Sequence, residues 1–284
     1  MIAGVRNFKI KNATGAERDL TRPGYLLWQP QGLGWGVDVE VMTVGNTFVV
    51  TDEQEKRPNP SGTMVFKGYA EYTDFLEFVQ VGGLSLGYRP LSTDNWRWLD
   101  CVLQIDKSEI DHTNQRLLCP VTFNATSHWY EIMQALTPQG EIDDQAMIYL
   151  DNEHHGYAYP YDYEDSNAGG IAINNGVLPS YFRLTFIGPV TNPVYTLYVN
   201  QKPVHRGRIV CNVLAGHRLV IDTRPGHAEI NDYNADGTLY IDRYGDSDFT
   251  TERFFQIPGG VSAMVVTAES SGQPNVVLEV FRRV

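Results

Sequence analysis

Most of this chain alternates apolar and polar residues over short runs that are separated by turn residues, which is the pattern of β-strands. Residues 68–90 differ, because their apolar side chains recur at i, i+3, i+4 and i+7, the spacing of one helix face. These side chains are Tyr72, Phe75, Leu76 and Val79. Gly82 and Gly83 then end the helix, and the alternation at 84–88 predicts a strand. The first half is therefore predicted to be α+β, a β-sandwich domain with one short helix.

The second half has the pattern of an all-β domain. We expect about ten strands there, at 171–175, 181–187, 194–199, 208–213, 218–222, 227–233, 238–243, 253–256, 262–267 and 276–281. Glycine, proline and asparagine groups separate them, and no helical spacing intervenes. A series of this kind predicts a β-sandwich, of jelly-roll type.

Two domains are expected on length as well, since 284 residues exceed one small core. We place the connection at 141–165, which holds eight acids and no Lys or Arg. The predicted organisation is mainly β, with domains at 1–140 and 166–284.

Residues 37–50 read as two strands around Gly45-Asn46, a hairpin signal. The following segment, 51–62, contains five charged residues, two prolines and no large apolar residue. Such a segment cannot fill a core. It is predicted to be either a flexible loop or an arm that becomes ordered on a neighbouring subunit.

The net charge of −12 argues against specific nucleic-acid binding through phosphate neutralisation, and against attachment to a membrane surface. The first twelve residues lack the apolar core of a signal peptide, and no run has the length of a membrane span. The three cysteines, Cys101, Cys119 and Cys211, lack CxxC spacing, so we expect buried thiols.

Three stretches offer metal-ligand chemistry, and in each another interpretation is favoured. The sequence from Asp232 to Gly237 matches the opening of a calcium loop, but Arg243 stands where a bidentate Glu is needed, and Asp236-Gly237 favours a tight hairpin. His112 lies in a predicted turn without a second ligand at metal spacing. A further cluster comprises Asp151, Glu153, His154 and His155, whose adjacent histidines would point to opposite faces of a strand.

We therefore expect no metal and no cofactor. The sequence contains no nucleophile motif, no phosphate-binding loop and no local pair of catalytic carboxylates. It therefore favours a structural role over an enzymatic one.

The order of several motifs carries a family resemblance. In the first half these are a helix with Tyr72, Phe75 and Phe78, a strand with Leu84, Leu86, Tyr88 and Pro90, the stretch 117–123, and Trp129-Tyr130. In the second half they are Phe186-Ile187-Gly188, Asn192-Pro193, 215–222 and 257–260. Together they resemble the distal tail proteins of long-tailed, non-contractile phages.

That resemblance implies a non-enzymatic virion protein at the distal end of the tail. In the family, the N-terminal domain forms a homohexameric ring, and a galectin-like C-terminal sandwich projects outward. The ring joins the tail tube protein to a tail-tip, fibre or lysin protein, and the genome and tape-measure protein pass through it. Residues 51–62 would then be an inter-subunit arm, centred on Glu55, Lys56, Arg57, Pro58, Asn59 and Pro60.

Two alternatives stay open. The C-terminal sandwich could bind host cell-wall polysaccharide through exposed aromatic side chains, although galectin-type folds often carry no sugar. A wall-degrading hydrolase is the third hypothesis, for which the sequence names no catalytic pair.

Overall fold

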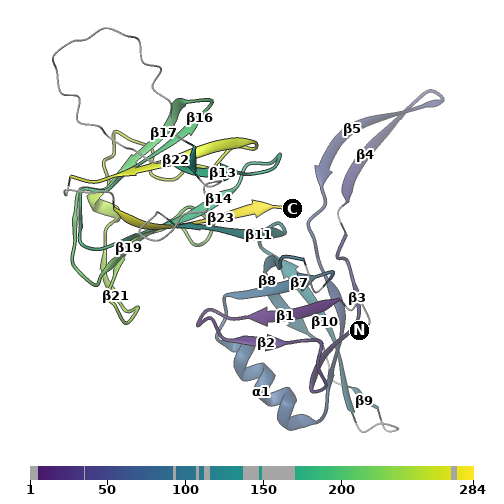
Figure 1. Ribbon diagram of the computed structural model, residues 1–284. Coiled ribbons are helices and arrows are strands. Elements are labelled where there is room, and N and C mark those ends of the chain that lie inside the picture. The colour runs from purple at the N-terminus through teal and green to yellow at the C-terminus, as the bar shows by residue number, and fades with distance from the viewer. Residues whose placement is uncertain are drawn as a thin grey trace, which may run out of the picture. The chain divides into compact units, whose positions relative to one another are not determined.

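The computed structural model describes residues 6–34, 36–91, 94–106, 109–111, 116–136, 147–148, 170–269 and 274–284. The chain divides into two compact units, Met1–Glu131 together with Val284, and Ile132–Arg283 (Figure 1). The expected acidic connection at 141–165 lies outside the described residues except for 147–148. The domain limits 1–140 and 166–284 therefore stay a prediction.

The first unit contains antiparallel strands and one helix. Its elements are β1 (Asn7–Lys11), β2 (Glu17–Asp19), β3 (Tyr25–Gln31), β4 (Val37–Val44), β5 (Thr47–Glu55), β6 (Ser61–Phe66), α1 (Tyr69–Gln80), β7 (Leu84–Arg89), β8 (Arg97–Ile105), β9 (Glu109–Asp111), β10 (Arg116–Ala125) and the start of β11 (Tyr130–Leu136). Strands β2, β1, β7 and β8 pair in that order, and β8 also pairs with β10. From β10 the pairing continues to β6 and then β3, while β4 and β5 pair with each other.

Alternation along the strands determines which side chains form the core of this unit. In β10 the odd positions Leu117, Cys119, Val121 and Phe123 are buried, as their spacing requires. The helix α1 buries Phe75 and Phe78, and the ring centroids of Phe75 and Phe66 are 5.4 Å apart. The predicted helix is confirmed, but Phe78 takes the buried position expected for Leu76, which is half-buried.

The second unit consists of β-strands and a short 3-10 helix in its described residues. Its elements are the rest of β11, β12 (Met147–Ile148), β13 (Gly170–Asn174), β14 (Tyr181–Ile187), β15 (Val190–Thr191), β16 (Val194–Val199), β17 (Lys202–Arg208), β18 (Asn212–Val213), β19 (Arg218–Asp222), β20 (Glu229–Tyr233), β21 (Leu239–Asp242), η1 (Tyr244–Asp246), β22 (Val261–Thr267) and β23 (Asn275–Arg283).

Two antiparallel sheets share one core in this unit. One runs β11-β23-β14-β19-β20-β21 and the other β12-β13-β22-β16-β17. Phe182, Leu184 and Phe186 on β14 belong to the same buried cluster as Tyr195 and Leu197 on β16. The predicted mainly β fold is thereby confirmed.

Two of the strands predicted in the second half are wrong. Residues 208–213 were expected as one strand, whereas β17 ends at Arg208 and β18 begins at Asn212. Strand β17 was missed because it is mostly exposed and carries Lys, His and Arg. It therefore lacks the alternation of apolar and polar residues by which strands were predicted. Residues 253–256 form no strand and instead line a pocket.

Across the described residues, no helix is long and apolar enough to cross a membrane. Cys101, Cys119 and Cys211 are all buried as free thiols, as predicted.

Candidate functional site

The most exposed element of the first unit is the ribbon formed by β4 and β5, residues 37–55, which we call the arm. Figure 1 shows it projecting from the unit, and its two strands form a two-stranded sheet of their own. The strands meet at the predicted Gly45-Asn46 turn, where Gly45 has φ 61°. Every residue from 38 to 55 is exposed. A two-stranded ribbon is marginally stable by itself, so the arm requires a further contact to hold its shape.

The outer half of the arm is apolar on both of its faces. Cross-strand partners share a face and successive pairs alternate, so the pairs Val41–Val50 and Met42–Val49 lie on opposite faces. The exposed apolar residues of this half, which we call the apolar tip, are Val41, Met42, Val44, Phe48, Val49 and Val50. Phe48 is 77% exposed. Exposed apolar side chains gathered in this way are typical of interaction sites.

The inner half of the arm is acidic, and one of its faces is entirely polar. There Asp38 pairs with Gln54, and Glu40 pairs with Asp52. A bulge follows Glu40 and separates this half from the apolar tip. The arm therefore presents an acidic face near the body of the unit and an apolar surface at its end.

The six residues predicted as the inter-subunit arm lie at the root of this ribbon. Glu55 is the last residue of β5, and its Oε1 lies 3.4 Å from Nδ1 of His128. The amide N–H of Lys56 donates to the carbonyl of Gly36 at 2.9 Å. Arg57 Nε donates to the carbonyl of Ala125 at 2.6 Å.

The remaining three predicted residues lead into β6. Pro58 is half-buried and Asn59 is exposed, while Pro60 is buried and accepts a hydrogen bond from the amide of Phe123 at 2.8 Å. A Cβ on Gly32 (φ 70°) would lie 2.7 Å from the carbonyl oxygen of Asn59, so this close approach requires glycine. Residues 56–60 thus fix the arm to the body of the unit, and Thr51 to Glu55 form the inner part of β5.

A cavity of about 130 Å³ lies at the root of the arm. Its lining includes Lys56, Arg97, His128 and Trp129. The indole Nε1 of Trp129 is buried without a hydrogen-bond partner in the structure. The lining combines charged and apolar side chains, and the volume is below the range of small-molecule sites.

A second exposed apolar surface of the first unit is the outer face of the sheet formed by β3, β6, β10 and β8. Trp28 is 55% exposed and Val102 is 61% exposed on this face. In the cross-strand row beside Trp28, Leu26, Val65 and Leu118 are neighbours and half-buried. We call Trp28, Leu26, Val65 and Leu118 the outer sheet patch, whereas Val102 lies opposite Asn124, farther along β10.

The candidate calcium loop is a hairpin. Asp232 is buried, with His217 Nδ1 at 3.1 Å and Arg243 Nη2 at 3.4 Å from its carboxylate. Asp236 Oδ1 accepts hydrogen bonds from the amide and hydroxyl of Thr238, at 2.9 and 2.6 Å. The two carboxylates therefore serve separate polar networks on β20 and its turn.

Within the described part of the chain, no group of three His, Cys, Asp or Glu side chains is placed to hold a metal ion. The histidine of the predicted turn, His112, lies outside the described residues. So does the cluster of Asp151, Glu153, His154 and His155.

The residues predicted from the sequence lie at the root of the arm, and the prediction did not include the apolar tip. The missed signal is the failure of strict alternation in β4 and β5, where Val41-Met42 and Phe48-Val49-Val50 place apolar side chains on both faces. A strand that is apolar on both faces is typical of strands whose two faces are both buried.

Comparisons with known proteins agree with the predicted resemblance. Residues 7–126 match the family model for the distal tail protein, N-terminal domain. No significant match was found among curated protein sequences. The resemblance to distal tail proteins is thus confirmed.

Solved structures share the fold over almost the whole chain. Chains of the phage P2 baseplate in its activated conformation match with TM-scores of 0.69 with calcium and 0.70 with strontium, at 15% and 16% identity, and 99% of each chain is covered. The SPP1 Dit protein, described as a paradigm of the hub adsorption apparatus in phages that infect Gram-positive bacteria, matches with a TM-score of 0.52 at 11% identity, covering 96% of this chain and 98% of that one.

Proposed function

We propose that this chain, whose residues 7–126 match the family model for the distal tail protein, N-terminal domain, is a structural hub protein of a phage tail tip that closes into a six-membered ring through its arm. The protein is a virion component at the distal end of the tail and performs no catalysis. Its role is to hold other tail proteins in a fixed geometry.

The observation that carries this proposal is the exposure of the apolar tip on both faces of the arm. Burial of the exposed side chains of Phe48, Val41 and Val50 is favourable by about 25 cal/mol per Å² of apolar surface removed from water. In the ring, the apolar tip of one protomer packs on the outer sheet patch of the next. Such a contact is heterologous, and repeated rotation by the same angle closes it into a ring.

The polarity of the arm also suits a channel. Asp38, Glu40 and Asp52 carry negative charge on one face of its inner half. If this face lines the opening of the ring, it repels the DNA phosphates and lets the genome and the tape-measure protein pass without being held. The ring joins the tail tube protein on one side to a tail-tip, fibre or lysin protein on the other.

The second unit is the outward-facing part of the hub, a galectin-like jelly-roll sandwich. A second candidate function, binding of host-wall polysaccharide, belongs to this unit. It is favoured by an open pocket beside β17 that combines aromatic rings with hydrogen-bonding side chains.

The experiment for the ring is deletion of the arm. Deleting 51–62 would also remove the start of β6, so the sharper variant replaces residues 38–54 by a Gly-Gly turn, which leaves the root contacts of Arg57 and Pro60 in place. The purified variant should be a folded monomer, whereas the wild type should show rings with sixfold symmetry in negative-stain images. Sixfold rings formed by the deletion variant would contradict the role of the arm.

A further inference from the structure

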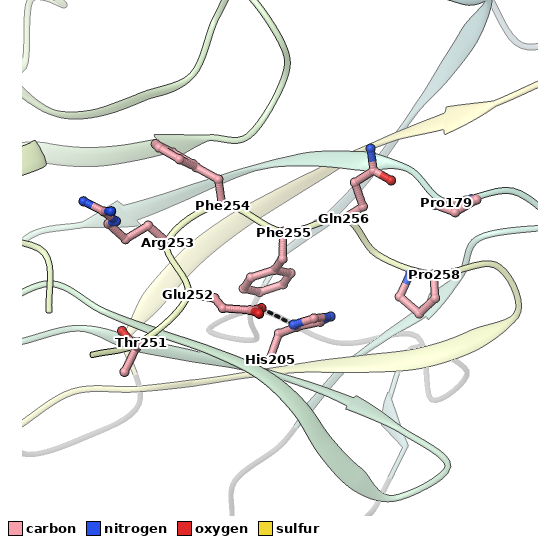
Figure 2. Close-up of a pocket in the computed structure, with 9 residues that line it drawn as sticks. All are labelled: Pro179, His205, Thr251, Glu252, Arg253, Phe254, Phe255, Gln256 and Pro258. Atoms are coloured by element: carbon pink, nitrogen blue, oxygen red, sulfur yellow. Dashed lines mark hydrogen bonds and ion pairs between the residues drawn. The ribbon is translucent and has the colours of Figure 1, made fainter. Parts of the chain in front are cut away.

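An open pocket of about 640 Å³ lies in the second unit, between β17 and the segment 251–258. Its volume is in the range of small-molecule sites. Figure 2 shows Glu252 and Phe255 converging on His205, with Pro179 and Pro258 on the other side of the imidazole.

The centre of the pocket is a fixed polar pair on an aromatic floor. Nδ1 of His205 is hydrogen-bonded to the Glu252 carboxylate. The imidazole stacks on Phe255, with ring centroids 4.9 Å apart and an interplanar angle of 16°. Phe255 is buried and stacks in turn on Tyr195 at 5.8 Å, so the floor is anchored in the core of the unit.

The segment that carries Glu252 is held to the core by the same tyrosine. Tyr195 Oη donates to the carbonyl of Arg253 at 2.7 Å. A Cβ on Gly207 would lie 2.1 Å from Cζ of Tyr195, so only glycine at this position of β17 leaves room for the ring. The pocket is therefore preorganised, which lowers the cost of binding.

The charges around the pocket favour a neutral ligand. The Arg253 guanidinium lies over Phe249 at 4.3 Å and over Tyr244 at 4.9 Å, and Figure 2 shows it pointing away from His205. Glu252 is 59% exposed at the pocket, and its carboxylate repels anionic ligands. A purely apolar ligand would desolvate this carboxylate and leave the acceptor sites that His205 does not use without hydrogen bonds.

We propose that this pocket binds a neutral saccharide segment. Glu252 accepts hydrogen bonds from sugar hydroxyls, and His205 offers its second ring nitrogen, which Figure 2 shows on the side of Pro258. The pyrrolidine rings of Pro179 and Pro258 contact the apolar C–H faces of the sugar. Saccharides combine hydroxyls that both donate and accept with apolar faces, which matches this lining. The inference rests on the second of the two proposed functions and is independent of ring formation.

The test is a glycan array that displays neutral, acidic and phosphorylated bacterial-surface saccharides, probed with the full-length protein and followed by calorimetry on the best neutral glycan. We expect saturable binding to a neutral saccharide. Glu252→Gln and His205→Ala should each weaken it at least about tenfold, since Glu252→Gln replaces a charged acceptor oxygen by an amide nitrogen and His205→Ala removes the ring nitrogen. Glu77→Gln, the same chemical change on an exposed residue of α1, should leave it unchanged.

Tyr195→Phe separates a positioning role from direct contact. It removes the hydroxyl that holds the Arg253 carbonyl and leaves His205 and Glu252 intact, so the affinity should fall by a smaller factor than with Glu252→Gln. Absence of binding to every neutral glycan would overturn the proposal. Affinity that is unchanged in both Glu252→Gln and His205→Ala, or a preference for peptides or phosphorylated glycans, would overturn it as well. None of these outcomes would alter the expectation for rings, which is measured separately by imaging.

Discussion

Arg57 and Ala125 connect the root of the arm to the end of β10, because Nε of Arg57 donates to the carbonyl oxygen of Ala125 at 2.6 Å. The two residues are separated by 68 positions in sequence. Their contact fixes the direction in which the chain leaves the arm and enters β6. The arm is therefore positioned by its root, while its tip has no contact that would position it within one protomer.

We predict that Arg57→Ala weakens ring assembly more than it weakens the fold. Arg57 is exposed, so the free energy of unfolding in urea should fall by no more than about 1.5 kcal/mol. Ring assembly should require a higher protein concentration, measured by light scattering coupled to gel filtration. Arg22→Ala, which removes an arginine that is 80% exposed and paired with Asp19, is the control and should leave assembly unchanged. Equal assembly of both variants would count against the role of the root.

A charged residue in the apolar tip should prevent assembly without unfolding the protomer. In Phe48→Asp the carboxylate would have to be buried against the neighbouring chain, which is unfavourable. Because Phe48 is 77% exposed, the unfolding free energy of the monomer should change by less than about 0.5 kcal/mol. Gel filtration and thermal unfolding check both parts.

The matched control for Phe48→Asp is Val177→Asp, which places the same charge on a residue of the second unit that is 91% exposed. It should assemble like the wild type. Loss of assembly in both variants would show that added negative charge is responsible, and that the tip is not.

Asp222 should make the second unit sensitive to acid. Burial raises the pKa of Asp222, but its hydrogen bonds and charge interaction with Arg224, together with the charge of Arg183, outweigh burial and hold that pKa below its ordinary value. The unfolded chain therefore binds this proton more readily, so the stabilisation is complete above about pH 4 and is lost as the pH falls further.

Asp222→Asn should accordingly cost about 3 kcal/mol of unfolding free energy at pH 7, since it leaves two arginines without their buried partner. The difference from the wild type should shrink below about pH 4. Urea unfolding at pH 7 and pH 3 measures it, and a difference that stays constant between the two pH values would contradict the assignment.

The cysteines should be unreactive in the folded protein. Burial raises the pKa of the Cys101 thiol to about 12 and that of Cys211 to about 11, and it raises the pKa of Cys119 as well. Reaction requires the thiolate, so a disulfide-exchange reagent at pH 8 should label none of them in minutes and all three in guanidinium chloride. Fast labelling of one thiol under native conditions would show that its strand opens.

The features predicted correctly from sequence are those in which local spacing and burial agree. Apolar and polar residues alternate from Leu117 to Phe123 because one face of β10 lies in the core. Gly45-Asn46 forms a turn because glycine readily adopts the positive φ that the turn requires. The stripe on α1 was predicted with Leu76 in the core, although Phe78 is buried there. In the structure Arg18 Cζ lies 5.1 Å from the ring centroid of Phe78, and Asn12 Nδ2 donates to the carbonyl of Phe78. The spacing within the helix does not reveal these contacts with a distant segment.

The features that were missed depend on contacts between distant segments or between chains. β17 has no apolar period and is held by its pairing with β16 from Val194 to Val199. Its residue His205 forms a pocket with Glu252, 47 positions away, and no local pattern links the two. The apolar tip has the composition of a core strand, and only the structure shows that its side chains are exposed.

Ring formation through the apolar tip can be measured by the native mass of the protein, compared between the wild type and Phe48→Asp at the same high concentration. We expect six chain masses for the wild type and one for the variant. A wild type that stays at one chain mass at every concentration, or a variant that assembles equally well, would contradict it.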